Sequence, residues 1–63
     1  MKYWVTWSWR ANDMIKGILS DEVEIYEPIT SVDVAEEAVK FHVGEPYAHE
    51  VDTILAWSKL EEI

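Results

Sequence analysis

The stretch Lys2–Arg10, KYWVTWSWR, alternates apolar and polar side chains and is rich in β-branched and aromatic residues. Such a pattern is typical of a strand with one buried face. Its apolar face consists of Tyr3, Val5, Trp7 and Trp9. The other face is polar except for Trp4. We therefore predict a strand with Trp7 and Trp9 in the core and Trp4 on the opposite face.

The next segment, residues 12–19, has a less decisive pattern. Asn12 stands where a helix N-cap would, and apolar pairs follow at positions 14/15 and 18/19. A short helix over about 12–19 fits this spacing, although a helix of about two turns is marginal alone and Gly17 weakens it. A loop or the arm of a hairpin fits nearly as well.

Residues Glu22–Ile29, EVEIYEPI, alternate again and predict a second strand. Val23 and Ile25 share one face of it, and the other face carries Glu22, Glu24 and Tyr26. Pro28 cannot donate a backbone hydrogen bond, so it marks an edge position or the end of this strand.

The clearest helix covers about residues 33–43. Asp33 or Ser31 can cap its start, and Gly44 is placed to end it. One stripe of this helix should face the core: Ala35, Ala38, Val39 and His42.

The segment Thr53–Leu60, TILAWSKL, reads as a third strand that is buried on both faces at its centre. The whole chain then forms one domain, residues 1–63. We predict an α+β fold: a small three-stranded, mainly antiparallel sheet with one main helix (about 33–43) packed on one face.

The composition narrows the class of protein. The chain has 63 residues, of which 49% are apolar and none is cysteine. A disulfide framework and a thiolate zinc site are therefore excluded, and a reducing, cytoplasmic location is favoured. No apolar run is long enough for a signal peptide or a membrane span, so no membrane contact is expected.

The charge is large and uneven. The formal net charge is −8. Residues 1–20 carry three cations and one acid, whereas residues 21–63 carry twelve acids and two cations. Direct binding to nucleic acid or to anionic lipid is disfavoured, and attraction to a basic protein surface is favoured.

The motifs of common enzymes are missing. Two isolated glycines cannot form a phosphate-binding loop, and no serine lies in a nucleophile elbow. Imidazole and carboxylate ligands suit zinc or manganese, and four such residues lie within nine positions: His42, Glu45, His49 and Glu50. Because His42 lies on the core-facing stripe, we predict a partly buried, hydrogen-bonded histidine instead. We expect no catalytic residue, no metal and no cofactor.

Carboxylates recur at close spacing on two elements. Glu22 and Glu24 share a strand face about 6.8 Å apart. On the predicted helix, Asp33, Glu36 and Glu37 lie at positions i, i+3 and i+4. This spacing places neighbouring Cβ atoms about 5–6 Å apart. With two aromatic side chains added, the candidate partner-binding residues are Glu22, Glu24, Tyr26, Asp33, Glu36, Glu37 and Trp4. Lys40 favours the alternative, a merely solvated face, because it partly neutralises the helix.

In its general character, short, acidic and rich in aromatic residues, the chain resembles phage-encoded inhibitors, including DNA-mimicking anti-restriction and anti-CRISPR proteins. The resemblance transfers no residue roles. It implies a non-enzymatic inhibitor in the host cytoplasm that presents carboxylates to a basic, nucleic-acid-binding protein. The alternative is a structural module that forms a homodimer when Lys2–Arg10 or Thr53–Leu60 pairs with a second copy.

Overall fold

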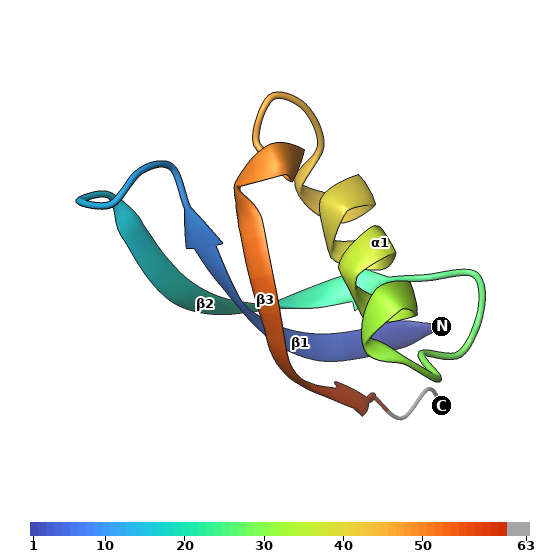
Figure 1. The fold of residues 1–63 in the computed structure, drawn as a ribbon. Coiled ribbons are helices and arrows are strands. Elements are labelled where there is room, and N and C mark those ends of the chain that lie inside the picture. Colours follow the sequence, from blue (N-terminus) through green and yellow to red (C-terminus); the bar gives the residue numbers. More distant parts are fainter. Residues whose placement is uncertain (61–63) are drawn as a thin grey trace.

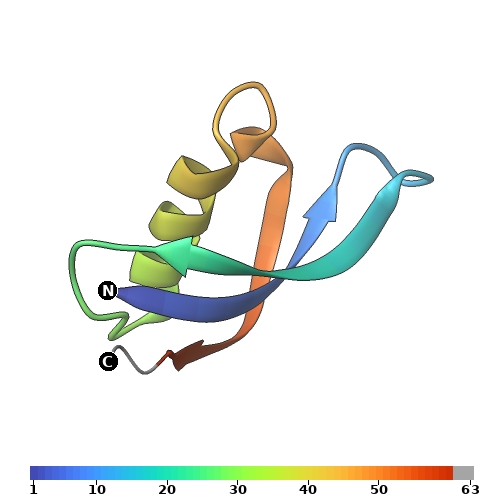
Figure 2. The ribbon, with the colours of Figure 1, turned by 180° about the vertical axis from the view of Figure 1, so that it is seen from behind.

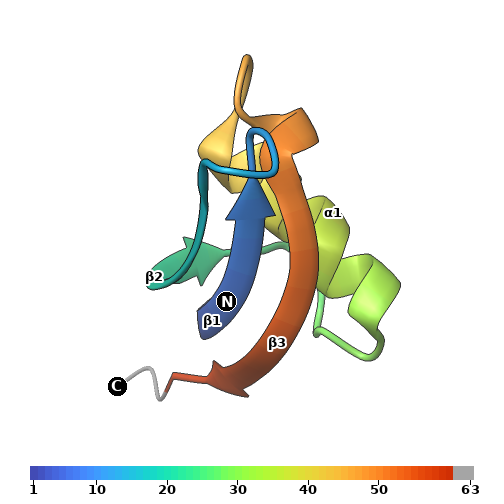
Figure 3. The ribbon, with the colours of Figure 1, turned by 60° about the vertical axis from the view of Figure 1, so that its left-hand side comes forward.

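The computed structural model describes residues 1–60 and has the predicted α+β architecture (Figure 1). The elements are β1 (Lys2–Arg10), β2 (Lys16–Glu24), α1 (Val32–Val43), the short 3-10 helix η1 (Ala48–Glu50) and β3 (Val51–Lys59). Two outer strands flank a central one in the order β2-β1-β3, and both are antiparallel to β1 (Figure 3). Helix α1 links the outer strands.

Strand β1 has the predicted bounds and the predicted faces. Trp7 is 1% exposed and Val5 is fully buried, whereas Trp4 is 46% exposed. Trp9 is only partly buried. As the central strand, β1 is hydrogen-bonded along both edges. The expectation that Lys2–Arg10 pairs with a second copy is therefore wrong; β2 and β3 are the edge strands.

Of the alternatives for residues 12–19, the short helix is wrong and the hairpin arm is confirmed, because these residues form a tight turn and the first half of β2. Asn12 caps the turn, not a helix: its side-chain oxygen accepts hydrogen bonds from the backbone N–H groups of Met14 and Ile15, at 2.8 and 2.9 Å. The nine residues of β2 then pair with β1 without a register shift. This continuous ladder pairs the backbone groups on one side of β2 with the central strand, and that tertiary pairing outweighs a two-turn helix that is marginal alone.

The second predicted strand, Glu22–Ile29, is therefore only the end of β2, which stops at Glu24. Ile25 continues the pairing by exchanging two hydrogen bonds with Met1. Beyond it the chain leaves the sheet as a loop that includes Pro28.

Helix α1 begins and ends where its capping residues dictate. The Ser31 hydroxyl accepts a hydrogen bond from the N–H of Val34 at 3.3 Å, so Ser31 is the cap and Asp33 lies in the first turn. Gly44 has a φ of 70°, a backbone conformation that favours glycine, and its N–H bonds the carbonyl of Lys40 at 3.0 Å.

The core lies between α1 and one face of the sheet (Figure 2). Ala35 and Val39 of the helix are fully buried, as predicted, against the apolar face of β1. Tyr3 closes one end of this core, where its hydroxyl accepts a hydrogen bond from the N–H of Ile29 at 3.1 Å. We call the side of the sheet that points away from α1 the outer face.

Strand β3 confirms the third prediction within two residues, with one correction. Its centre is not buried on both faces: Leu55 and Ala56 are exposed, and only Val51 and Ile54 of β3 join the core. Two register shifts against β1 displace the alternation that the sequence suggests.

The β1–β2 hairpin extends beyond the end of α1 as an arm (Figures 1 and 2). The molecule is accordingly elongated, with extents of 41 × 19 × 18 Å. Within residues 1–60, no helix has the length and the apolar character that crossing a membrane requires.

Candidate functional site

The structure divides the predicted acidic residues among three places. The first is the outer face of the sheet, where Trp4 lies directly opposite Glu22 and Lys2 directly opposite Glu24. The Lys2 ammonium is 4.0 Å from the carboxylate of Glu22. Glu22 therefore already has a cation from its own chain beside it.

The second place is the exposed side of α1. Nζ of Lys40 donates a hydrogen bond to Oε1 of Glu36 at 2.9 Å, which makes the two an ion pair. This hydrogen bond raises the pKa of Lys40 above its ordinary value. Asp33 is exposed in the first turn, where its charge favours the helix N-terminus. Asp33 and Glu36 therefore stabilise the helix itself. This weakens the case that they bind cationic pockets of a partner in place of phosphates.

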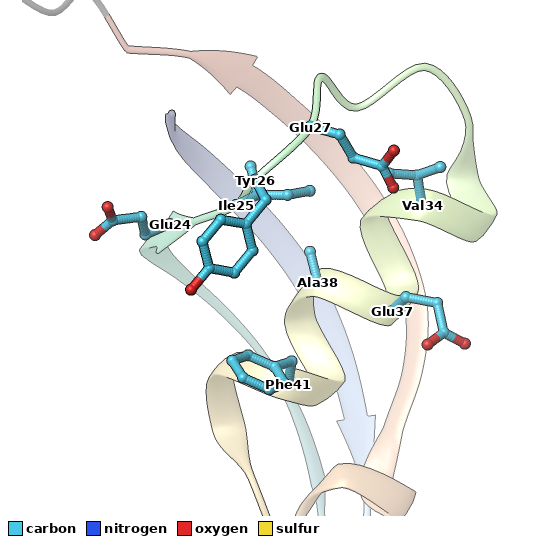
Figure 4. A pocket seen from close by; sticks show the side chains of 8 residues that line it. All are labelled: Glu24, Ile25, Tyr26, Glu27, Val34, Glu37, Ala38 and Phe41. Atoms are coloured by element: carbon cyan, nitrogen blue, oxygen red, sulfur yellow. The ribbon is translucent and has the colours of Figure 1, made fainter.

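The third place is a groove of about 390 Å³ between α1 and the chain that follows β2 (Figure 4). Glu24, Tyr26 and Glu37 of the predicted set line it together. We call it the acidic aromatic groove and define it by its lining residues: Glu24, Ile25, Tyr26, Glu27, Val34, Glu37, Ala38 and Phe41.

Local structure explains how the groove forms. Ile25 is buried in the core, and Val34 and Ala38 pack against that core, so these three supply apolar walls. Tyr26 follows Ile25 after the strand has ended and is 97% exposed. Phe41 is 82% exposed on α1. Two large aromatic rings thus stand in solvent beside an apolar surface.

In the described part of the chain, the carboxylates of the groove form no close ion pair, although Lys2 lies directly opposite Glu24 and the charge of Glu37 also acts on Lys40. Within residues 1–60, Glu24, Glu27 and Glu37 form no ion pair, in contrast to Glu22 and Glu36. Three negative charges around an apolar, aromatic surface suit a group with a cationic head and an apolar stem. Lysine and arginine side chains have that character.

Sequence reasoning found part of this groove and missed part of it. It identified Glu24, Tyr26 and Glu37, but it grouped them with Trp4, which shares the outer face with Glu24 and does not line the groove. Glu27 and Phe41 were missed. The available signal was the helical period: Phe41 follows Glu37 by four positions, and Val34, Ala38 and Phe41 share one side of α1.

His42 is hydrogen-bonded as predicted, but the expectation that it is partly buried on the core-facing stripe is wrong, because the residue is exposed at the edge of the helix. Its Nε2 lies 3.0 Å from Oδ2 of Asp21, and its ring meets the edge of Trp7 with 6.3 Å between centroids. Among residues 1–60, no three histidine or carboxylate side chains converge as metal ligands would.

Comparisons of the chain with models of protein families, with curated proteins and with solved structures found no match.

Proposed function

We propose that this chain is a non-enzymatic binding module that takes a basic segment of a partner protein into the acidic aromatic groove. The observation that carries the proposal is the composition of the groove. Three carboxylates that form no ion pair within residues 1–60 line the groove together with two exposed aromatic rings and an apolar wall.

Each part of the groove would act on a different part of a bound arginine or lysine. The carboxylates can accept charge-assisted hydrogen bonds, which a guanidinium donates in bidentate geometry. The faces of Tyr26 and Phe41 attract a cation, by roughly 0.5–1 kcal/mol at an exposed site. Val34 and Ala38 contact the apolar stem. The groove is thus suited to binding, and we assign it no reaction.

The net charge of −8 supports a basic partner in a second way, because it attracts such a surface over long range and raises the rate of encounter. We infer that the partner is a nucleic-acid-binding protein and that the chain inhibits it by filling cationic pockets which otherwise hold phosphates. Since the chain has no cysteine, we place this inhibition in a reducing, cytoplasmic compartment.

The proposal can be tested without knowing the partner. The probe is a short peptide of alternating arginine and serine, and its control has glutamine in place of arginine. In a titration followed by NMR, the backbone signals of Tyr26, Glu37, Ala38 and Phe41 should move with the arginine peptide only. Shifts spread evenly over all acidic residues would contradict a specific groove.

Two triple variants of equal charge separate the groove from general acidity. E24Q/E27Q/E37Q neutralises the groove, and D33N/E45Q/D52N neutralises the same number of exposed acids elsewhere that also form no ion pair within residues 1–60. We expect the first to weaken peptide binding at least about tenfold, because charged hydrogen bonds contribute roughly 1.5–3 kcal/mol each. The second variant should change the affinity for the peptide less than about threefold, because salt screens surface charges that lie far from the groove. Equal losses in both variants would remove the groove from the proposal.

A further inference from the structure

Strand β2 has a free edge whose backbone groups can be located. Met1 and Ile25 exchange both backbone hydrogen bonds, at 2.9 and 2.8 Å. In an antiparallel ladder without a register shift, such pairs recur at every second residue. Ile18 and Ser20 lie between them, so their N–H and C=O groups point away from β1. No other strand within residues 1–60 pairs with that edge.

The two edges of the sheet differ in their capacity to pair. β3 has two register shifts, and such irregularities bend a strand and protect its edge. β2 runs for nine residues without one. At its far end, the outward N–H of Glu22 is already bonded to Oδ1 of Asp21 at 2.8 Å. The open part of the edge is therefore Lys16–Ser20, in the arm.

This open stretch carries one exposed apolar side chain on each face of the sheet. Ile18 is 67% exposed on the outer face, and Leu19 is 39% exposed on the face of α1. An unpaired edge with exposed apolar side chains is the feature through which strands pair with another chain.

The charges along β2 point to the identity of that chain. Lys16 begins the strand, and Asp21, Glu22 and Glu24 end it. Antiparallel pairing with an identical strand would bring each end against its opposite. Lys16 also lies directly across from Arg10, an unfavourable pair of like charges, and has no ion-pair partner within residues 1–60.

We propose that the β2 edge binds a second copy of this chain, antiparallel, about a two-fold axis through Leu19. Ile18 and Ser20 then exchange backbone hydrogen bonds with Ser20 and Ile18 of the second copy. The two Leu19 side chains meet on the face of α1, and each Lys16 faces Glu22 of the other copy. The result is one continuous sheet with both helices on the same face.

Neighbouring registers fit the side chains less well. If the axis passed through Ile18, Lys16 would face Ser20. If it passed through Ser20, Lys16 would face Glu24, but Ile18 would lie against Glu22 and Leu19 against Asp21. Only the axis through Leu19 pairs lysine with glutamate and also leucine with leucine.

The association is measured on the full chain by sedimentation equilibrium over a range of concentrations up to millimolar. Lys16→Glu turns both proposed ion pairs into repulsions and should weaken the dimer at least about fivefold. The monomer fold should survive, because the new glutamate lies opposite Arg10. A chain that stays monomeric throughout, or a dimer that K16E leaves unchanged, would overturn the proposal.

A charge swap tests the register. K16E/E22K restores opposite charges across the proposed axis and should recover most of the lost affinity. K16E/E24K has the same net charge but the wrong spacing, and it should not recover it. Recovery by E24K in place of E22K would disprove the pairing through Leu19.

Ile18→Pro tests the backbone contact, since it removes an outward N–H without touching a hydrogen bond to β1. The dimer should be lost while the circular dichroism spectrum is retained. Leu55→Ala, at an exposed apolar residue of β3, is the control and should leave association unchanged. Of the groove residues only Glu24 is changed, in one control, and association is measured without the arginine peptide, so failure of these tests would leave the proposed function standing.

Discussion

Nε2 of His42, near the end of α1, lies 3.0 Å from Oδ2 of Asp21 on the edge strand β2. The same carboxylate accepts the backbone N–H of Glu22 through its other oxygen, at 2.8 Å. One exposed aspartate therefore connects the helix to the sheet and also closes one end of the β2 edge.

This arrangement predicts a pH dependence of stability. The hydrogen bond from His42, and then that from Glu22, hold the pKa of Asp21 below its usual 3.8. A carboxyl group whose pKa is lower in the folded state stabilises that state above the unfolded-state pKa. The contribution is lost as the pH falls below about 4 and through the folded-state pKa.

Asp21→Asn isolates this charge, because its side-chain oxygen can still accept the N–H of Glu22. Urea unfolding of both proteins should show the wild type more stable at pH 5 to 6, with the difference shrinking as the pH approaches about 2. A difference between the two proteins that stays constant over this range would show that the Asp21 charge does not stabilise the fold.

Removing the hydroxyl oxygen of Tyr3 should lower the free energy of unfolding clearly. Its hydroxyl is the acceptor for the buried N–H of Ile29, which holds the loop after β2 against the core. Tyr3→Phe leaves that N–H without a partner, so we expect a loss of roughly 1–3 kcal/mol in the free energy of unfolding.

The control for Tyr3 is Tyr26→Phe, which removes a hydroxyl from a side chain that is almost wholly exposed. It should change the stability by less than about 0.5 kcal/mol. Similar losses in the two variants, measured by urea unfolding with tryptophan fluorescence, would mean that the Tyr3 hydroxyl does not stabilise the loop.

The start of α1 separates two capping residues that the sequence leaves open. Ser31 accepts the N–H of Val34, so Ser31→Ala should cost about 1 kcal/mol of stability. Asp33→Ala removes only a charge near the helix N-terminus, worth roughly 0.3–1 kcal/mol at low salt. The Asp33 effect should also fade with added salt, unlike that of Ser31. A larger loss at Asp33 than at Ser31 would reverse the assignment of the cap.

The fold could be predicted from the sequence where local pattern and tertiary contact agree. Strand β1 alternates over its whole length, and α1 has both caps and an apolar stripe. Residues 12–19 could not be assigned, because apolar pairs at 14/15 and 18/19 suit a helix as well as a strand. Pairing with β1 decided between them, and that contact is not local.

The candidate site was predictable only as separate residues. Glu24 and Tyr26 were placed on one strand face and Glu37 on a helix. Whether they meet depends on where β2 ends, since Tyr26 reaches the groove only because the chain leaves the sheet after Ile25. Phe41 was not predicted to line the site, because its position in the helix lies at the edge of the core-facing stripe. Spacing along the sequence does not distinguish an exposed aromatic ring at such a position from a buried one.

Gly17 and Trp9 give a last prediction, about the arm. They pair across the hairpin, and a Cβ atom added at Gly17 would lie 3.0 Å from Nε1 of Trp9 and 3.1 Å from two ring carbons. Gly17→Val should therefore force the indole aside and cost roughly 1–3 kcal/mol, although valine is otherwise favoured in strands. In a Trp9→Ala background, the same valine meets no ring and should cost nothing or stabilise the arm. Urea unfolding of the four proteins in this double-mutant cycle measures the coupling, which we expect to exceed about 1 kcal/mol. Effects that add to within about 0.5 kcal/mol would mean that the indole does not rest on Gly17 in solution, because independent sites are additive to that degree.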